Sequence, residues 1–584
     1  MKIILIFPPQ WVPTAVYPSL PALSASLKKC GIKVVQRDLN IEAYDIFLSQ
    51  HELLIAQEKI RSVLRDIDSR EAPNIAETFK RDALHDALEK APVCIDKIES
   101  TKAIFRSEKF YDLVVYDKSM VIVNQGLQLI SASFYPTALW LDGFDMRYSP
   151  FSTEQVSKAI ADQTENPFLY LFKKHFISSL IGEGADALGI SLISQSQVIP
   201  GFTLARLLKK AAPDIHIVMG GSFITKNYQI LATSSLHPYV DSLIAYDGER
   251  SLLELVRALE QGRRRKSITN VILPGEKAEG TVKRVSEPTI NELPTPCFND
   301  LPLRRYFSPS SILSLNLSKG CYWNKCAFCG VTFTHPEFQQ RDPDCIVEDI
   351  ENLIDRCDSN TFRFTGESVP LNLLERVSER LIEKNLNVNW FCEVRFEEGF
   401  TLKRLETLYK AGCRELMFGL ESASQRVLDF MQKGIRTKTA SNIIRDCHVA
   451  GIGIHLFTFL GFPSETPEEA YETVDFILAH RSYITSVTLG AFKLEKYSPI
   501  WQNPSSYGIT IDFGDNTEDA RLIYDFNCHK GMDRKTFKNV YQKSVNSLMR
   551  YAQKSSIPKS GDHFFLYNCR YTDKASYSFF GKGP

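Results

Sequence analysis

The start of the chain alternates between short apolar runs and a segment of helical period. Residues 3–7 are continuously apolar, residues 19–30 repeat apolar positions at helical spacing, and residues 32–35 are mostly apolar again. Short apolar runs are typical of buried strands, and helical spacing between two of them predicts a β-α-β unit. The chain therefore opens a parallel, doubly wound sheet.

From about residue 41 to 180 the pattern changes to long, charged segments of helical period, such as 55–67 and 75–90. These segments predict a helical insertion. The alternation then resumes, with strands expected at 187–191, 215–219 and 242–245 and helices at 198–210 and 249–261. We expect residues 1–265 to form a flavodoxin-like (Rossmann-type) α/β domain that this insertion interrupts.

The second half of the chain repeats a strand-helix pattern. Residues 266–311 contain several prolines and little periodicity, which predicts a linker. Strands are expected at 312–317, 361–365, 388–393, 415–419, 454–460 and 486–492. They predict a partial (β/α)6 TIM-type barrel over 312–500, with its chemistry at the carboxyl ends of the strands. Residues 501–584 show no regular pattern and are expected to form a small, irregular C-terminal cap.

Composition narrows the choice of partners and compartment. The chain has 69 Lys and Arg and 69 Asp and Glu, so its net charge gives no reason to expect nucleic acid as a partner. We interpret the basic run 263–266 as a solvated linker. No stretch approaches the roughly 18 apolar residues of a membrane span, and the odd number of cysteines, 13, suggests reduced thiols. A soluble, cytoplasmic protein is expected.

Three cysteines lie close together directly after the first strand of the predicted barrel. Cys321, Cys326 and Cys329 therefore converge on one loop at the catalytic face. Thiolates are the ligands of iron–sulfur clusters, and three of them on a four-iron cluster leave one iron open for chemistry. The alternative is a zinc ion with His335 or Cys345 as the fourth ligand, although paired Cys-x-x-Cys knuckles are absent.

The cysteine segment resembles a known family. It reads Ser-Lys-Gly-Cys-Tyr-Trp-Asn-Lys-Cys-Ala-Phe-Cys-Gly over residues 318–330. It is similar to the loop of the radical S-adenosylmethionine superfamily, whose usual spacing is Cys-x3-Cys-x2-Cys; here the first gap is one residue longer. The Gly-Cys-Tyr-Trp lead-in and Phe328 look like the cobalamin-binding branch. The resemblance covers roughly residues 1–500 and implies a [4Fe–4S] cluster on Cys321, Cys326 and Cys329.

The resemblance also implies a site for S-adenosylmethionine at the ends of the barrel strands. Thr365-Gly366-Glu367 is similar to the family's Gly-Gly-Glu element, which holds the methionyl amino group, and Gly419-Leu420-Glu421-Ser422 to its sugar- or methionine-contacting strand end. In a strand, every second side chain points to the same face, so Glu393 and Arg395 of the third strand should lie at the same mouth of the barrel. A salt bridge at the barrel rim is an equal alternative to a ligand-binding role for these two residues. The implied residues are Thr365, Gly366, Glu367, Glu393, Arg395, Glu421 and Ser422. Glu465 and Thr466, in a turn similar to the family's Gly-x-Pro-x-Glu-Thr, are interpreted as structural.

The N-terminal part resembles the cobalamin-binding domain of the same branch. The implied cobalamin residues are Pro9, Gln10, Ser191, Gly220, Gly221 and Ser222, all at or after strand ends. Families that supply a histidine to cobalt carry Asp-x-His-x-x-Gly after the first strand, whereas here no histidine precedes His51. His216 only imitates that pattern and is expected to be structural. The resemblance thus implies base-off cobalamin without a histidine ligand.

Taken together, the resemblance implies a C-methyltransferase that acts at an unactivated carbon through a 5′-deoxyadenosyl radical and methylcobalamin. A rearrangement, ring contraction or cyclisation with the same cofactors is the alternative, and a non-catalytic cobalamin or redox sensor is a remote one. The partners implied are a small-molecule or peptide substrate and an electron donor such as flavodoxin or ferredoxin. The sequence identifies neither the catalytic residues, the substrate nor the oligomeric state.

Overall fold

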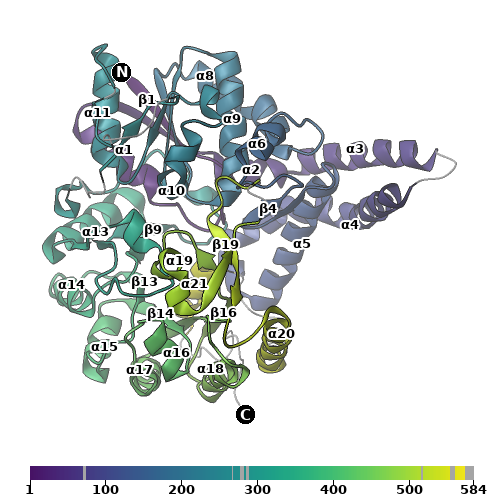
Figure 1. Ribbon diagram of the computed structural model, residues 1–584. Coiled ribbons are helices and arrows are strands. Elements are labelled where there is room, and N and C mark those ends of the chain that lie inside the picture. The colour runs from purple at the N-terminus through teal and green to yellow at the C-terminus, as the bar shows by residue number, and fades with distance from the viewer. Residues whose placement is uncertain are drawn as a thin grey trace. The chain divides into compact units, whose positions relative to one another are not determined.

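The computed structural model describes residues 1–69, 74–265, 267–275, 282–283, 289–514, 517–552 and 560–571. The chain divides into two compact units. Unit 1 comprises Met1–Lys283, Pro296–Ser311 and Thr517–Ala520, and unit 2 comprises Arg284–Thr295, Ile312–Asn516 and Arg521–Pro584. Both units combine a sheet with helices packed on it (Figure 1).

Unit 1 is built on a six-stranded sheet of order β2-β1-β5-β6-β7-β8. All neighbouring pairs are parallel except β7 and β8. Every residue of β5 is buried, which explains why this strand reads as a continuous apolar run. The strands are β1 (Lys2–Phe7), β2 (Lys33–Asp38), β5 (Ala187–Ser191), β6 (His216–Gly220), β7 (Ser242–Ile244) and β8 (Val271–Ile272). The expected doubly wound sheet is confirmed.

The helices of this sheet are α1 (Ser19–Lys29), α9 (Val198–Ala211), α10 (Ser222–Leu231) and α11 (Gly248–Glu260). The pattern predicted all of them except α10. This helix buries only five residues and begins directly after Gly221, so its apolar period is too short to stand out. His216 is buried and its ring contacts the Ser242 hydroxyl at 3.0 Å, as a structural histidine would.

The insertion between β2 and β5 is helical, as expected. Within it, α3 packs along α4 and α4 along α5, and a hairpin of β3 (Ala138–Trp140) and β4 (Gly143–Asp145) follows. Figure 1 shows α3 and α4 running away from the sheet of unit 1. The helices are α2 (Leu39–Phe47), α3 (Gln50–Asp68), α4 (Ile75–Phe105), α5 (Leu113–Ala132), α6 (Thr153–Ala159), α7 (Pro167–Leu171) and α8 (Ile177–Gly182).

Unit 2 contains a six-stranded parallel sheet of order β16-β15-β14-β13-β12-β9. The strands are β9 (Ile312–Asn316), β12 (Thr361–Thr365), β13 (Asn389–Val394), β14 (Cys413–Glu421), β15 (Gly453–Leu460) and β16 (Ser486–Ala491). The connecting helices are α13 (Pro343–Cys357), α14 (Leu371–Glu383), α15 (Leu402–Lys410), α16 (Gln425–Phe430), α17 (Thr437–Ala450) and α18 (Pro467–Ala479). This is the predicted partial (β/α)6 barrel.

The prediction of an irregular tail is wrong. Strands β17 (Leu494–Glu495), β18 (Ile509–Asp512) and β19 (Ile523–Cys528) form a sheet, and α19 (Pro499–Gln502), α20 (Arg534–Tyr551) and α21 (Gly561–Arg570) are helical. The apolar pattern did not reveal α20 because only three of its residues are buried, one at every fourth position. Residues 515–516, 553–559 and 572–584 of the predicted cap lie outside the described residues.

The stretch predicted as a linker, 266–311, contains β8 and 3-10 turns at Ile290–Glu292 and Leu303–Arg305 among its described residues. Lys266, the last residue of the basic run, lies outside them. The boundaries given for the domains and the linker stay predictions. Within the part of the chain that the structure describes, no helix is long and apolar enough to cross a membrane.

The two glycines after β6 differ in what they require, which gives a test of unit 1. Gly221 has φ 108° and ψ 173°, a region almost restricted to glycine, and a Cβ there would lie 2.3 Å from the Leu192 carbonyl oxygen. At Gly220 the nearest atom would be 3.6 Å away. We expect Gly221→Ala to destabilise the protein by about 2 kcal/mol or more and Gly220→Ala to have little effect, as measured by thermal unfolding. Equal losses would contradict this assignment.

Candidate active site

The cysteine loop is closed at its base by a short β-ladder. Strand β10 (Ser318–Lys319) pairs antiparallel with β11 (Gln339–Gln340), and α12 (Val331–Thr334) follows the last cysteine. Gly320 begins the loop with φ +73°, where a Cβ would lie 2.7 Å from the Glu337 carbonyl oxygen. The ladder and this close approach hold both ends of the loop just beyond the carboxyl end of β9.

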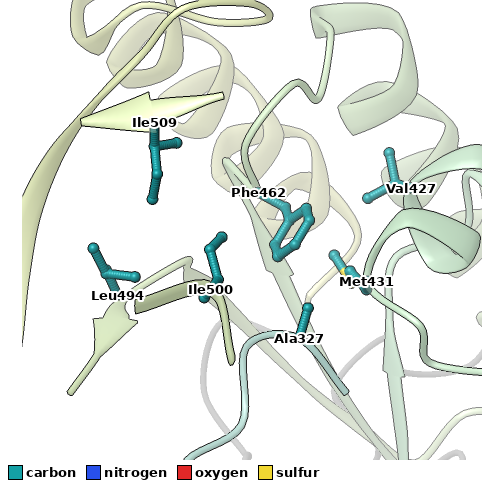
Figure 2. Packing of buried hydrophobic residues seen from close by; sticks show 7 residues of the cluster. All are labelled: Ala327, Val427, Met431, Phe462, Leu494, Ile500 and Ile509. Atoms are coloured by element: carbon teal, nitrogen blue, oxygen red, sulfur yellow. The ribbon is translucent and has the colours of Figure 1, made fainter. Parts of the chain in front are cut away.

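Ala327, between the second and third cysteines, anchors the middle of the loop. Its N–H donates to the Met431 carbonyl oxygen at 2.8 Å, and its carbonyl accepts from the Ile500 N–H at 2.9 Å. Its side chain belongs to a buried apolar cluster that Figure 2 shows gathered around Phe462. The cluster consists of Ala327, Val427, Met431, Phe462, Leu494, Ile500 and Ile509. The loop is therefore fixed by the fourth β/α unit and by α19 (Pro499–Gln502) together.

All three thiols are partly buried and lie close enough to interact electrostatically. Burial raises the pKa of Cys329 to about 12, and the charges of the other two thiols add to this effect. Burial also raises the pKa of Cys326, against which the charges of Lys433 and Arg395 act. Desolvated thiolates need a bound cation to be stable. Among the described residues, no group of three or more His, Cys, Asp and Glu side chains forms a site for a single metal ion.

Three of the predicted carboxylates meet at the mouth of the barrel. Glu393 is exposed to solvent, yet the protein around it is dense enough that burial raises its pKa. The charges of Glu367 and Glu421 raise that pKa further, and those of Arg363 and Lys433 lower it. Glu393 is thus a recessed carboxylate that solvent can reach, beside two further carboxylates and two cations.

The Thr365-Gly366-Glu367 element lies against the base of the cysteine loop. The Thr365 hydroxyl donates to the Asn316 side-chain oxygen at the end of β9. A Cβ on Gly366 would lie 2.3 Å from the Ser318 hydroxyl oxygen, so only glycine fits this contact. The Glu367 carboxylate lies 3.2 Å from the His335 ring. His335, the zinc ligand of the alternative hypothesis, therefore faces the carboxylates of the mouth.

Glu421 and Lys433 form a buried ion pair. The Lys433 ammonium lies 2.8 Å from Glu421 Oε1, and the two side chains are only 8% and 12% exposed. The pairing of β14 with β15 shifts register at this point, and Glu421 has φ +62°. A Cβ on Gly419 would lie 2.5 Å from the Glu421 carboxylate, so the glycine makes room for the pair. Such strain is typical of functional sites.

Arg395 joins the cysteine loop to the turn that carries Lys433. Its guanidinium donates to the Lys433 carbonyl oxygen at 2.7 Å and lies 4.3 Å from the centre of the Trp323 ring. The Trp323 indole N–H donates to the Gln432 carbonyl oxygen at 2.8 Å. Its ring occupies the space that a Cβ on Gly434 would need. Arg395 is thus tied directly to the cysteine loop and also to the turn whose Lys433 pairs with Glu421.

Ser422 is the exception among the predicted residues. Its side chain is fully buried, lies 3.3 Å from the Thr473 hydroxyl and accepts from the Ser424 N–H at 3.2 Å. These contacts place it beneath the start of α16 and not with the carboxylates. Its role in binding S-adenosylmethionine remains a prediction.

Sequence reasoning missed the helix that fills the inner side of the barrel. The Phe565 ring of α21 packs on Phe391, which shares a face of β13 with Glu393 by period two. Asp562 of the same helix pairs with Arg363 on β12, and Asn568 donates to Glu415 on β14 at 2.6 Å. The alternation of side chains along β12 could have placed Arg363 on the inner face of the strand. No local pattern in the sequence, however, indicates that Asp562 is its partner.

The ion pair of Arg363 with Asp562 predicts that substitutions at these two residues have non-additive effects on stability. Asp562 is 2% exposed, so Arg363→Leu removes the counter-charge of a buried carboxylate. We expect a loss of about 2 kcal/mol or more, seen as a lower midpoint of thermal unfolding. The double variant Arg363→Leu/Asp562→Leu should recover much of this loss, because it also removes the buried charge. A double variant that is simply the sum of both single losses would refute the pairing.

Glu465 and Thr466 have the structural roles expected of them. Glu465 is fully buried and accepts from the Gly461 N–H at 2.5 Å, and burial raises its pKa to about 7. Thr466 caps α18 in a reciprocal capping box with Glu469. Both residues hold the turn after β15.

The raised pKa of Glu465 predicts a pH-dependent stability. Since the folded carboxyl keeps its proton up to about pH 7 and the unfolded one only to about 4.5, the free energy of unfolding should fall as pH rises between these values. Glu465→Gln should remove this fall, which amounts to at most about 3 kcal/mol. Urea unfolding of wild type and variant at pH 5 and 8 measures it.

Glu469 supplies a control of opposite sign. Its pKa is lowered, chiefly by the hydrogen bond from Arg426, so Glu469→Gln should cost more at pH 8 than at low pH. Parallel pH dependences of wild type and Glu465→Gln would show that Glu465 does not retain its proton.

In unit 1, hydrogen bonds join the loops that follow β1, β5 and β6. Gln197 donates to the Pro8 carbonyl oxygen at 2.8 Å, and the Gln10 N–H donates to the Ser196 carbonyl oxygen at 3.3 Å. The Ser222 hydroxyl donates to the Ile193 carbonyl oxygen at 2.8 Å. The predicted cobalamin residues are therefore gathered at one edge of the sheet, where ligands of such folds bind.

Gln10 has the most specific surroundings of these residues. It is buried, and its amide nitrogen lies 3.0 Å from the Tyr44 hydroxyl and also donates to the Trp140 carbonyl oxygen. Its side-chain oxygen has no hydrogen-bond partner. The helical insertion, to which Tyr44 and Trp140 belong, thus contributes to this edge of the sheet. Ser191 pairs with the Ser19 hydroxyl at 3.1 Å.

With this geometry described, comparisons with known proteins identify the barrel. Residues 315–477 match the Radical SAM superfamily, so this part of the chain is a radical SAM domain. The α/β fold with parallel sheets and this domain in its second half agrees with the expected family and fold.

Two curated relatives match about half of the chain. An uncharacterised methyltransferase of Pyrococcus horikoshii is 27% identical over 50% of this chain and 63% of its own length. An anaerobic magnesium-protoporphyrin IX monomethyl ester cyclase of Rubrivivax gelatinosus is 28% identical over 46% of this chain and 50% of its own. The chain thus spans half to just under two thirds of these relatives.

A solved structure matches more of the chain. The radical S-adenosylmethionine methyltransferase TsrM of Kitasatospora setae, with cobalamin and a [4Fe–4S] cluster bound, is 15% identical and has a TM-score of 0.51. The match covers 88% of this chain and 81% of that one. At this identity the match shows a shared fold.

Proposed function

We propose that this chain is a cobalamin-dependent radical S-adenosylmethionine enzyme that methylates an unactivated carbon. The observation that carries the proposal is the loop of three partly buried thiols beside recessed carboxylates in a radical SAM domain. A Rossmann-type sheet with grouped strand-end loops accompanies it in the same chain. TsrM, which shares the fold, is itself a methyltransferase with both cofactors.

The residues of the loop fit a cluster. Cys321, Cys326 and Cys329 would hold it, because thiolates are its ligands and two cations favour the thiolate of Cys326. When bound, the cluster and S-adenosylmethionine supply a 5′-deoxyadenosyl radical, and methylcobalamin supplies the methyl group. The protein positions these groups and keeps water from the reactive carbon.

The carboxylates at the mouth suit the methionyl part of S-adenosylmethionine. Glu367 and the backbone of Thr365 and Gly366 would accept hydrogen bonds from its amino group. Glu393, recessed but open to solvent, would hold a further polar group of the ligand. Arg395 would act mainly by fixing the cysteine loop, since its guanidinium lies over the Trp323 ring, and Glu421 would act through its ion pair with Lys433.

At the sheet edge of unit 1, the unpaired side-chain oxygen of buried Gln10 suits an amide group, of which cobalamin carries several at its periphery. A Cβ on Gly220 would only make an ordinary contact with Ile244, whereas Gly221 is required by the fold itself. His216 is engaged with Ser242. Cobalamin is thus expected here without a histidine ligand.

Rearrangement or cyclisation with the same cofactors is the alternative, and the similarity to a named cyclase favours it over other chemistries. A small-molecule or peptide substrate, an electron donor such as flavodoxin or ferredoxin, and a cytoplasmic location belong to the same proposal.

Metal and cofactor analysis of the full chain, produced with cobalamin and handled without oxygen, tests the proposal. About four irons and one cobalamin per chain are expected, with iron lost in Cys326→Ala. The electron paramagnetic resonance spectrum of the cob(II)alamin form should lack axial nitrogen splitting, because no histidine is expected to bind the cobalt. Cys345→Ala is the matched control, since it should keep its iron. Zinc in place of iron would overturn the assignment.

Methyl-labelled S-adenosylmethionine separates the two reactions. A methyltransferase passes the label to a product, whereas a cyclase cleaves S-adenosylmethionine without transferring it. Cleavage with no labelled product from any tested substrate would favour the alternative.

A further inference from the structure

The ammonium of Lys433, which forms the buried pair with Glu421, lies 5.7 Å from the centre of the Phe328 ring and interacts electrostatically with the thiol of Cys326. This has a consequence for the cluster of the proposed function, on which this inference rests. We infer that Lys433 raises the reduction potential of the cluster and that Glu421 limits this effect. The pair thereby sets how easily a low-potential one-electron donor can reduce the cluster.

The charge of Lys433 is poorly screened. The lysine is 7% exposed as a residue, and its ammonium lies 2.8 Å from Glu421 Oε1. Burial acts against the charge, yet Glu421 and Cys326 together raise the pKa of Lys433, so it stays protonated. Charges removed from water act on each other far more strongly than charges at the surface.

The position of Lys433 is fixed from several sides. Its carbonyl oxygen accepts from Arg395, and the following Gly434 packs on the Trp323 ring. Its ammonium lies 5.7 Å from the centre of the Phe328 ring, within the Cys-x-x-Cys segment. A lysine held in this way acts as a fixed charge and not as a mobile surface group.

The charged groups that act on Cys326 are Lys433, Arg395, Cys321 and Glu421. Two of them are cations, and only Lys433 has its charge compensated by a neighbouring carboxylate at hydrogen-bond distance. Reduction adds one electron to a cluster that three thiolates already make negative, so a nearby cation stabilises the reduced form. A nearby carboxylate has the opposite effect.

Redox titration monitored by electron paramagnetic resonance tests this, on the reconstituted full chain without S-adenosylmethionine. Lys433→Met should disfavour reduction at least about tenfold, a shift of about 59 mV to more negative potential. Glu421→Gln should shift the potential the other way. The double variant should lie between the two single variants. No activity is needed for this readout.

Lys325→Met is the matched control. Lys325 directly precedes Cys326, but it is exposed and does not count among the charges that act on this thiol. Its removal should leave the potential nearly unchanged. Equal shifts for Lys325→Met and Lys433→Met, or no shift for Lys433→Met, would overturn the inference.

The outcomes also separate this inference from the proposed function. Wild type without a cluster signal would refute the proposed function itself. If Lys433→Met assembles no cluster, Lys433→Arg, which keeps the charge, and Glu421→Gln decide. An unchanged potential in Glu421→Gln would then refute the inference.

Discussion

Two backbone hydrogen bonds at Ala327 hold the cysteine loop in place, and the arrangement of the thiols depends on them. The partners, Met431 and Ile500, lie far along the chain, in the fourth β/α unit and in α19. Backbone groups that are buried must find partners, so the loop cannot move without leaving these groups unsatisfied. The apolar cluster around Ala327 then excludes water from both bonds.

The sequence was sufficient to predict the strands of the barrel but not their long-range partners. The barrel strands were predicted to within two residues at each end because each is short and largely buried, as Thr361–Thr365 illustrates with three buried residues. The three cysteines were found because their spacing is local. Lys433 could be placed in a turn, but its pairing with Glu421 depends on a register shift in β14 that no local pattern reveals.

The tail was missed for a similar physical reason. Helix α20 buries only Val540, Ser544 and Leu548, so its apolar stripe is sparse and partly polar. Helix α21 is buried on most sides and therefore has no amphipathic period. In unit 1, the cobalamin contact of Gly221 stays a prediction, and its backbone angles and the Leu192 carbonyl give a structural reason for glycine there that the sequence alone did not reveal.

The location of α21 bears on when the protein can mature. Arg363, Phe391 and Glu415 on the inner side of the barrel all contact this helix, which follows the barrel in the chain. A ribosome completes the cysteine loop long before it has made α21, so the inner side of the nascent barrel lacks its partner at that time. Folding of the barrel core therefore waits for residues 561–570, and a barrel that folded before them would leave the buried partners of Arg363 and Glu415 missing.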